Sequence, residues 1–574
     1  MKRAAFVVLF LIAPLSVFGQ QTRRYIVGMK PGAVRAAKSA QFADRDFQDL
    51  ANLDSFVVNL TDAEVQAMRN DSSVRYVESA DIKFFALGTT GHFGQPTAQS
   101  HPLDAQITPY GITMVHAPQV WPVAKGEGVN VVIVDTGIDY THPELKDHYQ
   151  GGFNAIPNPT TNDPKDDDGH GTHVAGTIAA ADNGFGVVGV APNAKIWSAK
   201  VLAPDPLTGT SSGSNAQIAA GLNWVLGKRN ELGGHWIVNM SLGQCTDLAV
   251  SSQCSPTPSF AMQSACQKLA DAGVLVFAAS GNDSTTTHAA TVSYPAAFSS
   301  VIAIGALDAT QTVASFSNQG PELALSGPGV GVFSSFIVGK GTNSFVNSAG
   351  NTYDAFALTP AGKGVLTGQY VYCGLGATAA DFPTSVKNNI ALIQRGGGIT
   401  FNAKTKGALA AGAKAVVIYN CSIAATPSTC ANDSFGGWTL IGKLADGTTD
   451  DPADLAFAWP VDVGISYADG EALRKAAAGS TLTETNVVDD YATESGTSMA
   501  CPHAVGVAAL VWSVAPNASA SDVKSALLNN AADLGAKGKD DVYGFGLLDA
   551  FAAARQLNPA AFSVKGRMPG RRGH

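Results

Sequence analysis

The clearest pattern in the chain is a series of mostly apolar runs that begins after Ile112, the first of which is continuous. The runs are VNVVIV (129–134), AKIWSAKVL, HWIVNMSL, GVLVFAAS and SVIAIGAL, and helix-like stretches such as 215–226 and 258–272 separate them. A run without polar alternation is typical of a strand buried on both faces, as in a parallel sheet. Strands that alternate with helices predict an α/β fold with a doubly wound parallel sheet.

Other patterns flank and interrupt this one. In residues 24–86, RYIVGM and SFVVNL read as strands and a helix starts after Thr61, which predicts a small α+β module. Residues 87–104 show no periodicity and are expected to be a linker. Residues 335–490 contain enough strands and helices for an inserted domain, mainly β or α+β. The larger domain is therefore expected in two parts, 105–334 and 491–557.

The chain begins with the composition of a secretory signal. Lys2 and Arg3 precede a mostly apolar run from Ala4 to Phe18, and Val17 and Gly19 suit cleavage before Gln20. We expect residues 1–19 to be a signal peptide of a secreted protein, with a retained N-terminal anchor as the alternative. No internal apolar run has the length of a membrane span, so none is expected in the mature form. Residues 558–574 form a basic tail.

Charge and cysteine content narrow the possible functions. The formal net charge of -9 argues against nucleic acid as a partner. Seven cysteines in an exported chain predict disulfides, and the pairs 245/254 and 421/430 are close enough in sequence to close small loops. Their pairing stays open. Cys501, inside a run of small residues, is expected to be a buried free thiol. No CxxC pair exists, so a structural zinc site is not expected.

Three polar residues stand at the ends of predicted elements. Asp135 directly follows a buried strand, where folds of this class bind ligands. His170 starts a small-residue helix. Ser498 lies where the turn ESGT becomes a long helix, beside free backbone N–H groups and the positive end of the helix dipole. A lone serine there would be a helix cap. Together the three supply a nucleophile, a base and a carboxylate that orients the base.

The segments around these residues are DTGID, HGTHVAGT and GTSMACPHAVG, in that order. They resemble the three catalytic signatures of the subtilisin-like serine proteases, the subtilases, whose members share the order Asp, His, Ser. The resemblance implies a secreted serine endopeptidase that cleaves polypeptides through an acyl-enzyme. It also implies a monomer that needs no organic cofactor and is made as a zymogen that processes itself.

The resemblance assigns further residues. Asn282, together with the Ser498 N–H, falls at the family's oxyanion hole. Two segments would pair with an extended substrate: Ser211, Ser212, Gly213 and Ser241, Leu242, Gly243. Ala279, Ser280, Gly281 and Ser293 would line the pocket for the residue before the cleaved bond. These small, uncharged residues favour a broad or apolar preference there.

A calcium site is implied by the same resemblance. The ligands would be the side chains of Gln106, Glu144 and Asn183 and the carbonyls of Ala181, Phe185 and Val187. Oxygen ligands along a glycine-rich loop suit a hard cation. Glu144 departs from the family, in which aspartate is common at this position.

The two smaller regions resemble known accessory domains of subtilases. Residues 24–86, above all VRYVESAD, resemble an inhibitor I9-type propeptide, which would block the cleft until it is cut. Residues 335–490 resemble a protease-associated (PA) domain, with ALIQRGGGITFNAKTKGALAAGAKAVVIYN as the telling stretch. Such a domain carries no catalytic residue and is thought to steer substrates or partners.

Two other classes of function remain as alternatives. A subtilase-like scaffold with a PA domain could be a non-catalytic binding or adhesion protein, although the complete set of Asp135, His170, Ser498 and Asn282 argues against this. The segment GTSSG (209–213) fits the GxSxG motif of α/β-hydrolase esterases, but the stretch before it reads as a loop and not as the required strand.

Overall fold

The computed structural model describes residues 22–33, 40–42, 44–87, 105–157, 161–204, 210–245, 255, 257–284, 290–422, 438–444, 449–476 and 479–563. The chain divides into two compact units, Met1–Asp81 and Ile82–His574. The expected signal peptide, most of the expected linker and the last eleven residues of the expected basic tail lie outside the described residues.

The first unit is a small antiparallel sheet with one helix. The spatial order is β2 (Gln48–Leu50), β3 (Ser55–Leu60), β1 (Arg23–Met29) and β4 (Val74–Ser79). Helix α2 (Asp62–Asn70) starts at the expected Thr61, whose hydroxyl accepts from the Glu64 N–H in a capping box. Its Val65 and Met68 pack with Phe56 of β3 in a common core. The unit ends at Asp81, so residues 83–86, expected in this module, belong to the second unit.

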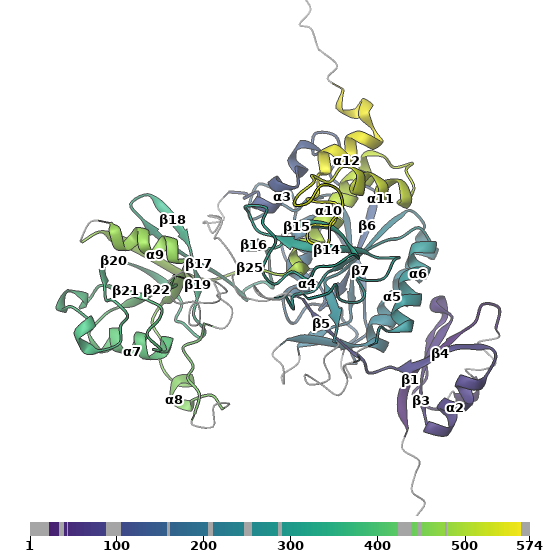
Figure 1. The fold of residues 1–574 in the computed structure, drawn as a ribbon, viewed down its shortest axis with the longest axis horizontal. Helices are drawn as coiled ribbons and strands as arrows, with labels where there is room; N and C mark the ends of the chain where they lie inside the picture. Colours follow the sequence, from purple (N-terminus) through teal and green to yellow (C-terminus); the bar gives the residue numbers. More distant parts are fainter. Residues whose placement is uncertain are drawn as a thin grey trace, which may run out of the picture. The chain divides into compact units, whose positions relative to one another are not determined.

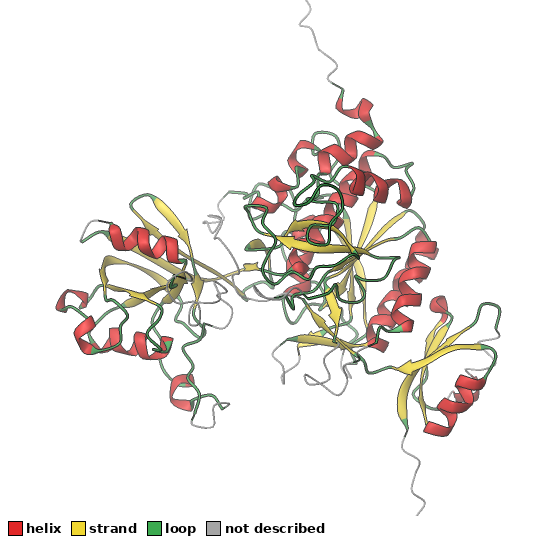
Figure 2. Ribbon diagram, in the orientation of Figure 1, coloured by secondary structure: helices red, strands yellow, loops and turns green. Residues whose placement is uncertain are grey.

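The second unit is built on a seven-stranded sheet (Figures 1 and 2). Every neighbouring pair of strands is parallel, which confirms the predicted doubly wound parallel sheet. The spatial order is β15 (Leu323–Pro328), β14 (Ile302–Leu307), β13 (Leu275–Ala279), β11 (His235–Met240), β6 (Val129–Asp135), β8 (Lys195–Lys200), β7 (Tyr149–Asn154).

Helices pack against this sheet, and one of them is buried in the core of the domain. Helix α4 (His170–Ala179) packs on α10 (Thr497–Val514), and α5 (Asn215–Leu232) packs on α6 (Phe260–Asp271). Within the described residues, α10 is the helix whose length and composition would allow it to cross a membrane, yet 94% of it is buried inside the protein. Its small residues explain how: a Cβ added at Gly506 would lie 2.5 Å from Val190. Shorter helices α3 (Tyr110–Met114), α11 (Ala520–Asn529) and α12 (Ala550–Leu557) complete this part.

The inserted region forms its own sheet of eight strands (Figure 1). The order is β18 (Asn351–Asp354), β17 (Gly341–Ser348), β24 (Thr481–Asp489), β20 (Gly364–Tyr372), β21 (Ile390–Gln394), β22 (Ala415–Tyr419), β23 (Asp462–Ile465), β19 (Phe356–Ala357). Helices α7 (Phe401–Ala410), α8 (Pro452–Leu455) and α9 (Tyr467–Lys475) accompany it, and two apolar cores fill it.

Two short strands join the insert to the main domain. Strand β16 (Val332–Ser335) leads into it and β25 (Tyr491–Glu494) leads out, and they pair antiparallel from Val332–Glu494 to Ser335–Tyr491. The chain therefore returns beside the point where it left, four residues before Ser498.

The cysteines divide into two groups. Cys266, Cys373 and Cys501 are free and buried, in agreement with the expectation for Cys501. Cys245 and Cys421 are disulfide-bonded. Cys254 and Cys430, which are close enough to them in sequence to close small loops, lie outside the described residues.

Candidate active site

Asp135 and His170 meet at the carboxyl end of β6, an inner strand of the main sheet. Asp135 is the last residue of β6 and His170 the first of α4, and both side chains are buried. The His170 Nδ1–H donates to Asp135 Oδ1 at 2.7 Å. Asp135 therefore fixes the tautomer with its hydrogen on Nδ1. In the neutral ring this leaves a lone pair on Nε2 that can accept a proton. His170 Nε2 is buried and has no hydrogen-bond partner in the described part of the chain.

A buried carboxylate holds the loop that delivers His170. Asp166 Oδ1 accepts the N–H groups of Asp168 and Gly169, both at 3.0 Å. Its Oδ2 accepts the N–H and the hydroxyl of Thr172, at 2.9 and 2.6 Å. Burial raises the pKa of Asp166, which these hydrogen bonds only partly offset. Sequence reasoning did not single out Asp166, although its place in the DDDGH segment was visible.

Ser498 lies in the first turn of α10 and contacts Ser241. Its hydroxyl donates to the Ser241 carbonyl at 3.0 Å, and the Ser241 hydroxyl donates to the Ser498 carbonyl at 2.8 Å. The Ser498 hydroxyl is thus engaged by a carbonyl rather than by His170 Nε2. The side chains of Ser498 and His170 are nevertheless buried in the same part of the domain, because α10, which carries Ser498, packs on α4, which carries His170, and on β11.

Strand β5 (Lys83–Ala86) lies between the two segments expected to bind substrate. It pairs antiparallel with β10 (Ser211–Ser214) on one side and with β12 (Leu242–Gln244) on the other. The register sets Phe84 opposite Gly213 and Phe85 opposite Gly243. The next residue, Leu87, donates its N–H to the Ser241 carbonyl at 3.2 Å. This is the geometry of a peptide bound by strand addition.

The Leu87 carbonyl contacts the asparagine expected in the oxyanion hole. Asn282 Nδ2 donates to the Leu87 oxygen. Asn282 Oδ1 accepts the Thr497 N–H at 2.9 Å and its hydroxyl at 2.8 Å. These two bonds hold the amide with its N–H₂ group toward Leu87 and connect it to the turn that carries Ser498.

Asn318 braces the segment expected to line the substrate pocket. Its side-chain N–H₂ group donates to the Thr291 carbonyl at 3.0 Å and to the Ser293 hydroxyl at 3.2 Å. A Cβ at Gly281, whose φ of +115° already disfavours other residues, would lie 2.2 Å from that nitrogen. The expected Ala279 and Ser280 lie in this segment and are fully buried, and the Ser293 N–H donates to the Ser280 carbonyl at 2.8 Å. Sequence patterns carried no signal for Asn318.

The electrostatic environment of His170 is strongly negative. Burial alone lowers the pKa of His170, but the charge and hydrogen bond of Asp135 outweigh it, and the pKa rises to about 10. Glu494 and Asp168 add smaller contributions in the same direction. Glu494, the last residue of β25, is itself buried, and burial raises its pKa to about 7.

The six residues expected to bind calcium form one connected cluster. Gln106 Nε2 donates to the Ala181 carbonyl at 2.7 Å, and Asn183 Nδ2 donates to Glu144 Oε2 at 2.9 Å. Glu144 Oε1 accepts the Val187 N–H at 3.0 Å, and the Phe185 N–H donates to Asn183 Oδ1 at 3.1 Å. Burial raises the pKa of Glu144 to about 7.

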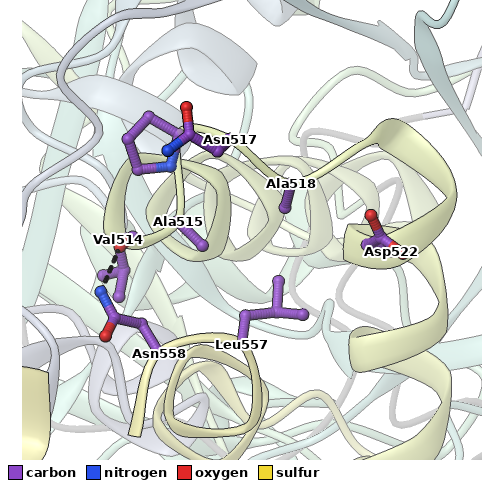
Figure 3. Close-up of a pocket in the computed structure, with 8 residues that line it drawn as sticks. Val514, Ala515, Asn517, Ala518, Asp522, Leu557 and Asn558 are labelled. Carbon is purple, nitrogen blue, oxygen red and sulfur yellow. Dashed lines mark hydrogen bonds between the residues drawn. The ribbon is translucent and has the colours of Figure 1, made fainter. Parts of the chain in front are cut away.

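Two other features do not compete with this site. Ser211, the centre of the GxSxG segment, lies in strand β10 and donates to Asp168 Oδ2 at 2.8 Å, so it is not on a strand-to-helix elbow. A cavity of about 380 Å³ lies at the C-terminal end of α10, the opposite end from Ser498, between Val514, Leu557 and Asn558 (Figure 3).

Comparison with known proteins identifies the relatives of this fold and site. The Subtilase family profile matches residues 126–357 and 340–546. Subtilisin E of Bacillus subtilis (strain 168) is 33% identical over 317 residues, which are 54% of this chain and 72% of that protein. Subtilisin DY of Bacillus licheniformis is 40% identical over 233 residues, 40% of this chain and 76% of that protein. The psychrophilic subtilisin-like protease Apa1 from Pseudoalteromonas sp. AS-11 matches in structure with a TM-score of 0.57 and 30% identity, over 80% of this chain and 99% of that one.

Proposed function

Because this chain belongs to the subtilase family and is a serine-type endopeptidase, we propose that it is a secreted enzyme made as a self-processed zymogen. In this proposal Ser498 is the nucleophile, His170 the general base and Asp135 the group that orients it. Asn282 and the Ser498 N–H form the oxyanion hole. Polypeptides are the substrates and no organic cofactor takes part.

The observation that carries the proposal is the position of Leu87. Its N–H bonds to the Ser241 carbonyl, its oxygen accepts from Asn282, and the strand before it pairs on both edges. A peptide held in this way presents the carbonyl carbon of Leu87 as the atom to be attacked. The Leu87–Gly88 bond is therefore the proposed maturation site, and residues 83–87 act as the chain's own product-like inhibitor.

The reaction follows from the groups around that carbonyl. The Ser498 hydroxyl turns from the Ser241 carbonyl to His170 Nε2, which takes the proton while Oγ bonds to the carbonyl carbon. The oxygen that becomes negative is met by the Asn282 N–H₂ group. The proton then passes from His170 to the leaving nitrogen as the C–N bond breaks, which leaves an ester at Ser498. Water, deprotonated by His170, cleaves that ester and restores the serine.

The Ser498→Ala variant of the full chain tests the proposal directly. In a protease-deficient host, the wild-type chain should yield a mature form that begins at Gly88, whereas the variant should keep its pro-segment. Intact mass and N-terminal sequencing give both ends. Ser513→Ala is the matched control, because Ser513 lies near the opposite end of the same helix, where it bonds to the Leu510 carbonyl and the Gly126 N–H. Mature protein from Ser498→Ala would overturn self-processing, and a different N-terminus would overturn the assigned bond.

Calcium is the proposed structural cation. The donor set of Gln106, Glu144 and Asn183 and the carbonyls of Ala181, Phe185 and Val187 fits a hard cation, because all six groups supply oxygen. Among the described residues, the groups that contact the buried Glu144 carboxyl are an amide, a backbone N–H and the Tyr491 hydroxyl, none of which is positively charged. The space near it exists because residue 186 is glycine: a Cβ there would lie 1.9 Å from Glu144 Oε1.

This ligand set contains a single carboxylate. No group of three or more His, Cys, Asp or Glu side chains that could hold a metal occurs among the described residues. The cation would therefore be bound mainly by amide and backbone oxygens. When bound it would neutralise Glu144 and stiffen the 181–187 loop, with no part in the chemical step.

Secretion and covalent structure complete the proposal. We infer a signal peptide at 1–19, which would direct export of the chain and then be removed. Export would bring the chain to an oxidising compartment where disulfides persist. Cys245–Cys254 and Cys421–Cys430 are the proposed pairs. Peptide mapping of the mature protein without reduction would identify both loops, and a cross-pairing between them would contradict this assignment.

A further inference from the structure

A second buried carboxyl lies close to the proposed base. Glu494 ends strand β25, and its side chain is 3% exposed. Its Oε2 is 3.9 Å from Nδ1 of His173, whose side chain is fully buried. His173 follows His170 by three residues on α4, so the two rings lie on neighbouring turns of one helix.

The hydrogen bonds of His173 fix where its protons can be. Its Nε2 is 2.9 Å from the Val332 carbonyl, which can only accept, so Nε2 carries a hydrogen. In a neutral ring, Nδ1 then carries the lone pair, and Nδ1 is the atom that lies 3.9 Å from Glu494 Oε2. Within the described residues, neither His173 Nδ1 nor Glu494 Oε2 has a hydrogen-bond partner, and both are buried.

Two buried atoms that lie 3.9 Å apart without hydrogen-bond partners are reconciled if one of them holds a proton. The pair is either a protonated Glu494 beside a neutral His173 or an ionised Glu494 beside an imidazolium, and both forms are neutral overall. Burial raises the pKa of Glu494 to about 7 and lowers that of His173 to about 3, which favours the first form. The Ala492 carbonyl also faces the His173 ring.

The charge of this pair matters because of what surrounds it. Elements packed around the pair contribute these titratable groups: Asp135 from β6, Asp166 and Asp168 from the loop before α4, His170 from α4, and His503 from α10. Asp135 and Asp168 favour an imidazolium at His170, yet a general base must be neutral before it can act. Loss of the proton from the Glu494–His173 pair would add a further negative charge and strengthen this effect.

We propose that Glu494 is a positioning residue for the general base, His170. Glu494 shares a proton with His173 and thereby sets the lower pH limit at which His170 can act. This inference rests on the proposed roles of His170 and Ser498. It gives Glu494 no contact with substrate. Its effect on His170 is electrostatic and acts through space, over the distance between the neighbouring turns of α4 that carry the two histidines.

The test is the pH dependence of kcat/KM of the mature enzyme for a short chromogenic peptide. Glu494→Gln keeps the size of the side chain and removes its ionisation. The acidic limb should then move to lower pH by about half to one unit, the order expected for one charge on a neighbouring turn. The value on the plateau should stay within about threefold. Glu494→Asp keeps an ionisable group, so the acidic limb of this variant should lie close to its wild-type pH.

Glu484→Gln is the matched control. It also removes a fully buried carboxyl, but in β24 of the insert, and should leave the limb where it is. Labelling of Ser498 by a fluorophosphonate, followed against pH and normalised to the final extent of labelling, counts only folded sites. This measurement keeps the test valid for a variant that folds poorly.

The possible outcomes separate the two proposals. A limb that stays unmoved or rises in Glu494→Gln overturns the role of Glu494, even if the variant is less stable. A shift of equal size in Glu484→Gln overturns it as well. If Ser498→Ala still hydrolyses the peptide, the proposed function itself fails, whatever the Glu494 variants do.

Discussion

Phe84 allows a test of which side chains of a bound peptide the proposed substrate cleft recognises. It lies in β5, opposite Gly213 on one side and Gln244 on the other, and its side chain is completely buried. Its neighbour Phe85 is the same residue type on the same strand but only partly buried. Successive side chains of a strand point to opposite faces, which explains the difference. If residues 83–87 occupy the substrate's position, these two phenylalanines must contribute very unequally.

The expected size of the effect follows from burial. A fully buried phenylalanine removes about 150–250 Å² from water, and replacement by alanine gives up on the order of 120 Å² of this area. At about 25 cal/mol per Å² the loss is about 3 kcal/mol, or roughly 100-fold in kcat/KM. The same replacement at Phe85 should cost about threefold or less.

The assay compares three p-nitroanilides with the mature enzyme at substrate concentrations below KM. They carry the sequences KFFAL, KAFAL and KFAAL, so that the second and third differ only in which phenylalanine is lost. We expect KAFAL to be cleaved about 100-fold less efficiently than KFFAL, with KFAAL close to KFFAL. Equal losses for the two alanine peptides, or a larger loss for KFAAL, would refute the assignment of 83–87 as a substrate mimic.

Three further predictions concern other parts of the molecule. Thr497→Val removes one of the two bonds that hold Asn282 and should lower kcat about tenfold with little change in KM in steady-state kinetics. EDTA should lower the melting temperature by on the order of 5 °C, and Ca²⁺ should restore it where Mg²⁺ does not, if the proposed site is real. Asp462→Asn should reduce the loss of thermal stability between pH 5 and pH 9. Burial raises the pKa values of Asp462 and Glu484 well above normal, so each holds its proton more tightly when folded, and stability falls as pH rises past the unfolded-state pKa. A melting temperature with the same pH dependence in wild type and variant would argue against this.

Much of the main domain could be predicted because its signals are local. Five of the seven strands of the parallel sheet were visible as mostly apolar runs. The two that were missed, β7 and β15, are the two edges of that sheet. Strand β7 reads YQGGFN, and β15 ends in SGP. An edge strand is paired on one side only, so polar residues and glycine are tolerated there and the apolar signal fades.

What could not be predicted depends on contacts between distant segments. The KFFA stretch reads as a strand in either unit, and only its pairing with β10 and β12 assigns it to the cleft. Asn318 looks like any loop asparagine until the turn at Gly281 is placed beside it. Likewise, Glu494 could be read only as part of the turn before Ser498, because its burial beside His173 follows from the pairing of β25 with β16.

That pairing also bears on how the gene could have grown. Because Ser335 and Tyr491 are paired neighbours, the whole of 336–490 is, in topological terms, the loop of one β-hairpin. A sequence inserted in a hairpin loop leaves the register of both strands unchanged, provided that its own ends come close together. The insert could therefore be exchanged for a two-residue turn, or for another domain with adjacent termini, while the pairing of β16 with β25 still holds the start of α10, and with it Ser498, in place. In this sense the catalytic domain offers a ready attachment point for modules beside its own cleft.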